Sequence, residues 1–329
     1  MSLPTTMRAA TRREYGGPEV IAMETLPVPT PAAGELLIRV HAAGLDRASL
    51  HLLEGDPWLA RLALGVRTPK RVILGQQVAG EVAAIGPEVA GYAVGDRVHG
   101  VATSGAFAEY ALAKPDALAH TPQGVRMHDA ATLGVSGMTA LGAVLDKGKA
   151  QSGERVLILG GSGAVGTSAI QLAVHAGAEV TAVCSASKLD LVAGRGAQAA
   201  YGYRTSDLSA MGGPFDLIVD IAGNRKLRAL RSALTPTGRL VIIGGESGGH
   251  FLGGIQRNLW ASLANGFTRQ ELGWMFSETT SQGCARLAEL VAAGGLRPAI
   301  DRVASLDDLA TALMDMRRGA LRGQVVIEP

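Results

Sequence analysis

Residues 155–166 read RVLILGGSGAVG, and this stretch decides the fold of the chain. Arg155–Leu159 is a continuous apolar run of strand length, and glycines at positions 160, 163 and 166 follow it directly. A helical pattern then covers Ala164–His175, and a second apolar run, Glu179–Cys184, comes next. A strand, a glycine-rich turn, a helix and a second strand in this order predict a parallel βαβ unit that binds a dinucleotide.

Each glycine of this turn has a predicted task. Gly160 can turn sharply out of the strand, Gly163 lacks a Cβ atom so that a pyrophosphate can approach, and Gly166 lets the helix pack close to the strand. The helix start offers unpaired N–H groups and a partial positive charge. A purely structural turn in another α/β domain is the alternative. The residues expected to bind the cofactor here are Gly160, Ser162, Gly163, Ala164, Val165 and Gly166.

The end of the second strand indicates which dinucleotide binds. A site for NADH usually has Asp or Glu there, about 20 residues after the first glycine. Here the strand is followed by Ser185, Ser187 and Lys188, and the first carboxylate, Asp190, is expected on the next helix. Hydroxyls and a lysine suit a 2′-phosphate better than a 2′-hydroxyl. We therefore expect NADPH rather than NADH, although Lys188 taken alone could be a solvated helix residue.

The rest of the chain predicts two kinds of domain. Short apolar runs separated by Gly and Pro in the first third indicate a compact, partly closed β domain, with strands at Glu35–His41, Val78–Gly86 and Asp96–Val101. Apolar runs that alternate with helical patterns after Pro122 indicate a parallel sheet covered by helices on both sides.

Several elements of the second half follow from the same patterns. Their predicted ranges are a helix at His128–Leu145, strands at Asp216–Asp220 and Arg239–Ile243, helices at Cys284–Ala293 and Leu306–Arg317, and a last strand at Gln324–Ile327. The last strand is expected to return to the first domain. The fold class is therefore α/β.

Composition limits the function classes. The chain has 329 residues, 47% of them hydrophobic and 18% charged, with a formal net charge of +2. That length predicts about two domains, and so small a charge argues against nucleic acid or a membrane as partner. Cys184 and Cys284 are the only cysteines, which suits a reducing compartment. The start of the chain lacks the pattern of a signal peptide, so we expect a cytoplasmic protein.

The chain resembles the medium-chain dehydrogenase/reductase superfamily, in its zinc-free quinone oxidoreductase branch. The segments that carry the resemblance are Tyr15–Val20, Val40–Asp46, Ala79–Val82, Gly95–Val98, Gly105–Tyr110, the glycine turn, Asp220–Asn224, Gly244–Gly245 and Gly323–Val326. The resemblance implies a GroES-like substrate domain at residues 1–123 and 269–329, and a Rossmann dinucleotide-binding domain at residues 124–268.

The same resemblance argues against a metal. Zinc-dependent relatives carry a Cys where this chain has Asp46, Gly-His-Glu where it has Gly75–Gln77, and Cys or Asp where it has Val135. Zinc prefers thiolate and imidazole ligands, so no zinc is expected. Zinc-free relatives usually have Asn in place of Asp46. Asp46 is therefore either a catalytic group that borders the nicotinamide and substrate, or a partly buried polar group paired with Arg47 or a backbone N–H.

The resemblance also implies roles for residues outside the glycine turn. Thr139 matches a threonine that faces the nicotinamide, and Tyr203 matches a position near the adenosine phosphate, although it could also be a half-buried strand aromatic. Asn224, Gly244 and Gly245 are expected near the nicotinamide ribose.

Three functions are compatible with these residues. The first is an NADPH-dependent oxidoreductase that transfers a hydride to a quinone or related conjugated carbonyl without zinc. The second is an enoyl reductase that acts on a thioester or another activated alkene. The third is an NADPH-binding protein without significant turnover. The expected partners are an apolar or planar carbonyl substrate and further copies of the chain, as a homodimer or homotetramer.

Overall fold

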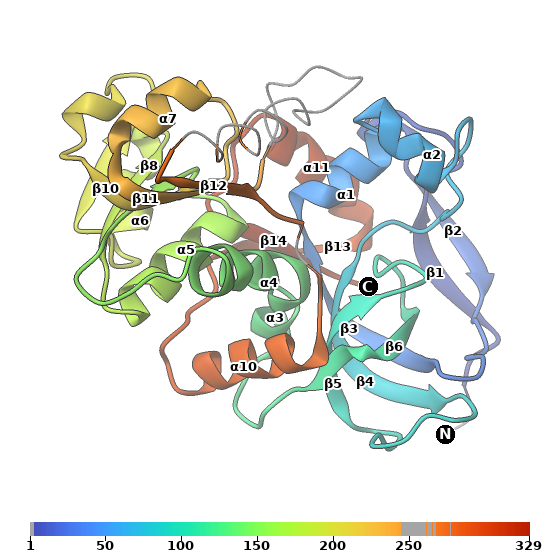
Figure 1. Ribbon diagram of the computed structural model, residues 1–329. Coiled ribbons are helices and arrows are strands. Elements are labelled where there is room, and N and C mark those ends of the chain that lie inside the picture. The colour runs from blue at the N-terminus through green and yellow to red at the C-terminus, as the bar shows by residue number, and fades with distance from the viewer. Residues whose placement is uncertain (1–2, 245–260, 262–264, 266–267, 277) are drawn as a thin grey trace. The chain divides into compact units, whose positions relative to one another are not determined.

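A computed structural model describes residues 3–244, 261, 265, 268–276 and 278–329 (Figure 1). The chain divides into two compact units. Unit 1 comprises Met1–Met138, Glu278–Gly294 and Ile300–Pro329, and unit 2 comprises Thr139–Ser277 and Gly295–Ala299. Within the described residues, no helix combines the length and the apolar character needed to cross a membrane.

Unit 1 is built on an antiparallel sheet that closes on itself. Its strands pair in the order β3 (Leu36–Leu45), β4 (Gln77–Ile85), β5 (Arg97–Ala102) and β6 (Tyr110–His120), and β6 also pairs with β3. Alternate residues of these strands, such as Ile38, Val82 and Val98, are buried in one hydrophobic core. The prediction of a partly closed β domain in the first third is confirmed.

The C-terminal tail completes this sheet. β14 (Gln324–Glu328) pairs antiparallel with β3, and β13 (Ile300–Ser305) pairs parallel with β14. Residues 324–327 are all buried, because the strand is covered on both faces. The predicted return of the last strand to the first domain is confirmed.

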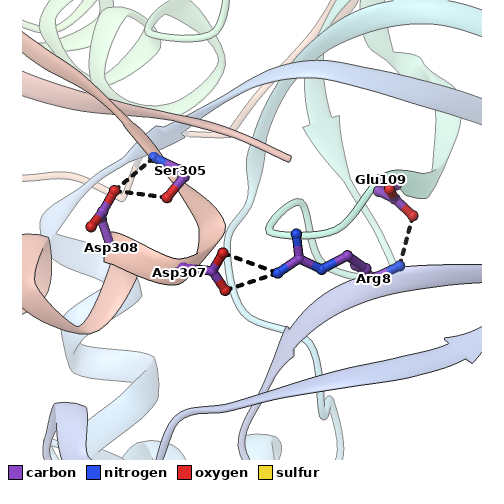
Figure 2. A network of polar contacts seen from close by, with 5 residues as sticks. All are labelled: Arg8, Glu109, Ser305, Asp307 and Asp308. Atoms are coloured by element: carbon purple, nitrogen blue, oxygen red, sulfur yellow. Dashed lines mark hydrogen bonds and ion pairs between the residues drawn. The ribbon is translucent and has the colours of Figure 1, made fainter.

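A polar network links the tail to the first hairpin of unit 1, which consists of β1 (Thr6–Thr11) and β2 (Ala22–Pro27) (Figure 2). The Arg8 Nη2 atom on β1 lies 2.8 and 3.0 Å from the two carboxylate oxygens of Asp307. The Arg8 backbone N–H donates to Glu109. Ser305 and Asp308 form a capping box where the chain turns toward α11 (Leu309–Arg317). Because both ionic partners are more than half exposed, the ion pair orients the tail and contributes at most about 1 kcal/mol.

The helices α1 (Arg47–Glu54), α2 (Arg61–Leu64) and α10 (Ser281–Ala292) also belong to unit 1. The predicted helix at His128–Leu145 is not continuous. It consists of α3 (Met127–Ala130), a π-helical turn at Leu133–Gly137, α4 (Met138–Leu141) and a second π-helical turn at Gly142–Asp146.

Close backbone packing accompanies this break. A Cβ atom at Gly134 would lie 2.2 Å from the Gly100 carbonyl oxygen, so the first π turn sits directly on β5. The residues predicted to point inward, Ala130, Leu133, Leu141 and Val144, are nevertheless all buried. The periodicity therefore identified the buried face correctly, whereas the prediction of one regular helix was wrong.

Unit 2 is a doubly wound parallel sheet. Its strands are β7 (Arg155–Leu159), β8 (Glu179–Cys184), β9 (Ala199–Gly202), β10 (Phe215–Asp220), β11 (Leu234–Ile242) and β12 (Glu271–Trp274), in the order β12-β11-β10-β7-β8-β9. The helices α5 (Ala164–His175) and α7 (Leu227–Ala233) lie on opposite faces of it, and α6 (Leu189–Ala193) follows β8 (Figure 1). The strand order reverses beside β7. Ligands of such sheets bind outside the carboxyl ends of the strands at this switch point.

His99 gives unit 1 a predictable response to acid. Its ring is fully buried, with Nδ1 3.0 Å from the Thr121 hydroxyl and Nε2 3.2 Å from the Cys284 carbonyl oxygen. Because a carbonyl only accepts, Nε2 carries the proton and donates. Burial lowers the pKa of His99 to about 4.

We therefore expect the free energy of unfolding to fall as the pH drops from about 6.5 to about 4, by up to about 3 kcal/mol. Over that range the unfolded chain binds a proton at this histidine and the folded chain does not. Denaturant unfolding at a series of pH values measures the effect, with His99→Gln as the comparison. An equally steep pH dependence in His99→Gln would contradict the assignment.

Candidate functional site

The glycine turn of unit 2 begins with a left-handed residue. Gly160 has φ +92°, a conformation that L side chains rarely adopt. The backbone N–H groups of Gly160 and Gly161 both donate to the Val183 carbonyl at 2.9 Å, so the turn is attached to the end of β8. The sharp turn predicted at Gly160 is confirmed.

Gly163 and Gly166 have opposite surroundings. A Cβ atom built at Gly163 would meet only the Gly160 carbonyl oxygen, at 3.9 Å, so the space beside this residue is open. A Cβ atom at Gly166 would lie 2.2 Å from the same oxygen, which leaves room for glycine alone. The close packing predicted at Gly166 is therefore confirmed, and Gly163 has the free approach that a pyrophosphate requires.

The start of α5 provides hydrogen-bond donors beside this open space. Gly163 is the N-cap residue, and the first helical hydrogen bond runs from the Thr167 N–H to the Gly163 carbonyl at 2.9 Å. No described residue accepts a hydrogen bond from the backbone N–H groups of Ala164, Val165 or Gly166. Such a helix terminus attracts an anion. Ser162 is half-buried in the same turn.

The end of β8 carries hydroxyls and a lysine. Ser185 is the N-cap residue of a 3-10 turn over Ala186–Lys188, and Ser187 is exposed within it. Asp190 lies in the first turn of α6, as expected. The Lys188 side chain is only 8% exposed, so the reading of this residue as a solvated helix position was wrong.

Tyr203 lies beside this strand end. Its backbone N–H donates to the Cys184 carbonyl at 2.9 Å, and its side chain is 40% exposed. It follows β9 instead of lying within it, so it is not a half-buried strand aromatic.

Two arginines at Tyr203 were not predicted as site residues. The Arg204 guanidinium lies 5.5 Å from the Tyr203 ring centroid. The Arg225 Nη2 atom donates to the Tyr203 carbonyl at 3.1 Å and to the Ser206 carbonyl at 3.4 Å. Arg225 thereby links the loops that follow β10 and β9. The signal in the sequence was weak, because each is a single basic residue next to an expected site residue.

The loops after β10 and β11 meet on the other side of the glycine turn. The Ile221 and Ala222 N–H groups donate to the Leu159 carbonyl at 3.0 and 3.2 Å. A Cβ atom at Gly244 would lie 2.0 Å from the Ile221 carbonyl oxygen, so these two loops are in backbone contact. The structure therefore brings Gly160 and Gly244 to one edge of the sheet. Gly245 lies outside the described residues.

Asn224 follows a fixed turn in the same region. The carboxylate of the buried Asp220, at the end of β10, accepts a hydrogen bond from the Gly223 N–H at 3.0 Å. Gly223 has φ +67°. Asn224 comes next and is exposed, so its amide is available to a ligand.

Unit 1 holds Asp46 in a buried polar network. Asp46 Oδ1 accepts from the Ser49 N–H at 2.7 Å and from the Ser49 hydroxyl at 2.9 Å, and Oδ2 accepts from Gln77 Nε2 at 3.1 Å. Gln77 Oε1 in turn accepts the N–H groups of Val135 and Ser136 at 2.9 and 3.0 Å. Asp46 is thus the N-cap of α1, and its pairing with a backbone N–H is confirmed.

The protonation equilibrium of Asp46 reflects its burial. Only 3% of the residue is exposed. Burial raises the pKa of its carboxyl, while the hydrogen bonds from Ser49 and Gln77 act against that shift. The network ends at Ser136 on the first π turn, three positions before Thr139, which lies buried on α4.

These residues do not fit a zinc site. Gln76 has an amide and Val135 an apolar side chain, and Asp46 already accepts three hydrogen bonds. Throughout the described part of the chain, no three His, Cys, Asp or Glu side chains gather as metal ligands would.

Two family models match the chain. One, described as an alcohol dehydrogenase GroES-like domain, covers residues 32–123, and the other, described as a zinc-binding dehydrogenase, covers residues 195–327. The first of these overlaps the closed sheet of unit 1.

Individual relatives extend the similarity over nearly the whole chain. A quinone oxidoreductase of Sus scrofa is 30% identical over 95% of both chains. The trans-enoyl reductase pgmF of Aspergillus terreus is 30% identical over 89% of this chain and 86% of its own length. A mycobacterial protein solved in complex with NADPH is 25% identical and superposes with a TM-score of 0.82, covering 98% of this chain and all of that one.

Proposed function

This chain is an oxidoreductase of the medium-chain dehydrogenase/reductase superfamily, in its quinone oxidoreductase-like branch, and on that premise we propose that it reduces quinones or related conjugated carbonyls with NADPH and without zinc. The observation that carries the proposal is the glycine turn. Gly160 makes a left-handed turn, Gly163 leaves open space and Gly166 packs on the backbone, beside three backbone N–H groups without a described acceptor.

The residues around the adenosine end support NADPH as the cofactor. Ser185, Ser187 and Lys188 follow β8, and Arg204 and Arg225 lie at Tyr203, which is bonded to the end of the same strand. No carboxylate occurs at this strand end before Asp190. A doubly charged phosphate is favoured where cations and hydroxyls gather. The NADPH complex of the mycobacterial relative agrees with this assignment.

Bound NADPH would supply the hydride, and the protein would supply orientation and electrostatics. The N–H groups at the start of α5 would hold the pyrophosphate, with Ser162 beside them. Asn224 and Gly244 would border the nicotinamide ribose, and Thr139 would contact the nicotinamide. Asp46 acts in this proposal as a positioning residue, because both of its carboxylate oxygens are engaged within the protein.

Turnover with a panel of acceptors tests the proposal. NADPH oxidation is followed by absorbance with benzoquinones, naphthoquinones, phenanthrenequinone, enones, enals and enoyl thioesters, and NADPH affinity is measured in parallel by titration. We expect quinones and conjugated carbonyls to be reduced with the highest kcat/KM. Tight NADPH binding without oxidation by any acceptor would leave only the third function, a binding protein without turnover.

An enoyl reductase is the second candidate. The similarity to the trans-enoyl reductase pgmF favours it, because that relative and the Sus scrofa quinone oxidoreductase are equally identical to this chain. Both reactions place a hydride on an electrophilic carbon conjugated to a carbonyl. A kcat/KM for enoyl thioesters at least tenfold above that for every quinone would establish the second candidate.

The purified protein is expected to contain well below one zinc ion per chain. One matching family model is described as a zinc-binding dehydrogenase. At the positions where zinc-dependent relatives carry their ligands, however, this chain has Asp46, Gln76 and Val135. Elemental analysis after expression with added zinc measures this directly. Stoichiometric zinc whose removal by a chelator abolishes turnover would overturn the zinc-free proposal.

Asp46→Asn is expected to lower kcat about fivefold and the free energy of unfolding by about 1–3 kcal/mol, as the loss of a buried acceptor does. The new amide would point an NH₂ group at Gln77 Nε2 or at the Ser49 N–H. Because Asp46 only positions its neighbours, the pH profile of kcat should keep its shape. Asp116→Asn, at an exposed carboxylate of β6, is the matched control. Loss of one limb of the profile in Asp46→Asn alone would instead make Asp46 a proton-transfer group.

A further inference from the structure

A short segment of unit 1 exposes an unusual amount of apolar surface. It begins at a 3-10 turn over Trp58–Ala60, continues through α2 and ends at Arg71 (Figure 1). Its large apolar side chains are exposed at Trp58 (54%), Leu59 (39%), Leu62 (70%) and Val66 (63%). So many exposed apolar side chains within one short segment make it a candidate interaction site.

The segment is held in place by its own hydrogen bonds. The Tyr15 hydroxyl donates to the Gly65 carbonyl at 2.7 Å, and the Lys70 N–H donates to the Leu64 carbonyl at 2.8 Å. Gly65 has φ +119°, and a Cβ atom there would lie 2.0 Å from the Thr68 carbonyl oxygen. The loop that exposes these apolar side chains is therefore held in one conformation by hydrogen bonds and close backbone packing.

The same segment is strongly basic. It contains Arg61, Arg67, Lys70 and Arg71, and no Asp or Glu occurs between Asp56 and Glu81. Neither Lys70 nor Arg71 forms an ion pair with a described carboxylate. Buried Arg12 adds a further cation near Arg71, and its Nε atom has no partner among the described residues. This part of the surface therefore carries a positive charge that the described carboxylates leave unbalanced.

A hollow beside the loop adds hydroxyl groups to this charge. Lys70 and Arg71 line it together with Thr103 and Ser104, the apolar residues Leu26, Val72 and Ile73 complete its lining, and its volume is about 470 Å³. The Ser104 Oγ atom accepts the Leu112 N–H at 2.8 Å, which leaves its own proton to donate. Two cations and a hydroxyl donor suit a phosphate group.

The net charge of +2 argued against a membrane as partner, but the cations of this one segment make a local charge that the net value conceals. We therefore propose that residues 58–71 form a peripheral docking surface for a bilayer that carries anionic lipids. Trp58, Leu62 and Val66 would enter the boundary between headgroups and acyl chains, where tryptophan is favoured. Arg67, Lys70 and Arg71 would face lipid phosphates, each contributing attraction near an anionic surface. Arg61 instead donates to the backbone carbonyls of Glu54 and Gly55. A second copy of the chain is a poor occupant, since a twofold contact places the same positive surface against itself. This proposal does not rest on the identity of the reduced substrate.

Vesicle flotation with purified full-length protein tests the proposal. The vesicles contain phosphatidylcholine alone or phosphatidylcholine with phosphatidylserine. We expect binding to the anionic vesicles only, and weaker binding as salt is added. Leu62→Ser/Val66→Ser and Lys70→Glu/Arg71→Glu should each lower the vesicle partition coefficient at least about tenfold. NADPH affinity and thermal melting of each variant show that the fold is intact.

Two matched controls make the test specific. Val94→Ser removes an equally exposed apolar side chain (67%), and Lys114→Glu reverses an exposed charge on β6. Both should bind anionic vesicles as the parent chain does. No vesicle binding by the parent chain, or equal loss in the controls, overturns the proposal. Self-association abolished by Leu62→Ser/Val66→Ser, without any vesicle binding, would assign the surface to a second copy instead.

Discussion

Gly163→Asp is expected to lower NADPH affinity by at least about a thousandfold, since a carboxylate about 4 Å from a pyrophosphate charge is repelled by about 4 kcal/mol at a partly exposed site. The fold should tolerate the change. Gly163 has φ −85° and ψ 177°, which any residue adopts, and its Cβ atom would meet nothing closer than 3.9 Å. Aspartate is also a favourable N-cap residue, so the free energy of unfolding should stay the same or rise slightly.

Two neighbouring substitutions separate binding from folding. Gly163→Ser keeps a capping side chain without the charge, so it should cost much less affinity than Gly163→Asp. Gly166→Ala should instead destabilise the protein, because its Cβ atom would lie 2.2 Å from the Gly160 carbonyl oxygen. Isothermal titration with NADPH and denaturant unfolding measure the two quantities. Near-parental affinity in Gly163→Asp would refute the proposed pyrophosphate site.

The parts of the fold that the sequence predicted best lie around this turn. The predicted ranges of β7, α5 and β8 match the structure residue for residue. The reason is physical: three glycines with different steric tasks, between two runs that are apolar on both faces, permit few other arrangements. Fully buried strands leave a continuous apolar signal that has sharp ends.

Prediction was poorer where buried structure is irregular. β3 continues to Leu45, beyond the predicted end at His41, because β4 and, from the far end of the chain, β14 pair with its last residues. The predicted helix at His128–Leu145 is interrupted by the π turn at Leu133–Gly137, where Gly134 packs against the backbone of Gly100. Both depend on contacts between residues far apart in the sequence, which periodicity within one segment does not contain.

The same limit applies to the candidate site. The glycines and the β8 strand end were predictable because they are local motifs. Arg225 reaches Tyr203 from another loop, and Gln77 joins Asp46 to Ser136 across three elements. The burial of Lys188 was likewise hidden, because a lysine after a strand is ordinarily solvated. Such groups become evident only when the chain is folded.

Ser185→Asp is expected to reverse the cofactor preference. The ratio of NADPH affinity to NADH affinity should fall about 100- to 1,000-fold, because a new carboxylate at the end of β8 repels the 2′-phosphate and can accept the ribose hydroxyl of NADH. Ser185 is an N-cap residue with φ −70° and ψ 147°, and aspartate suits that position. The fold should therefore be unchanged, and NADH affinity should rise.

The measurement is the dissociation constant of each cofactor for the parent chain and the variant. Ser152→Asp is the control. Ser152 is exposed and precedes the amino end of β7, whereas Ser185 follows the carboxyl end of the neighbouring strand β8. The same added charge there should leave the ratio unchanged, which separates a local effect from one of net charge. If Ser185→Asp weakens both cofactors equally, the strand end contacts the adenosine without distinguishing its 2′-substituent. In that case the preference for NADPH would have to come from Lys188 or from the two arginines at Tyr203, Arg204 and Arg225.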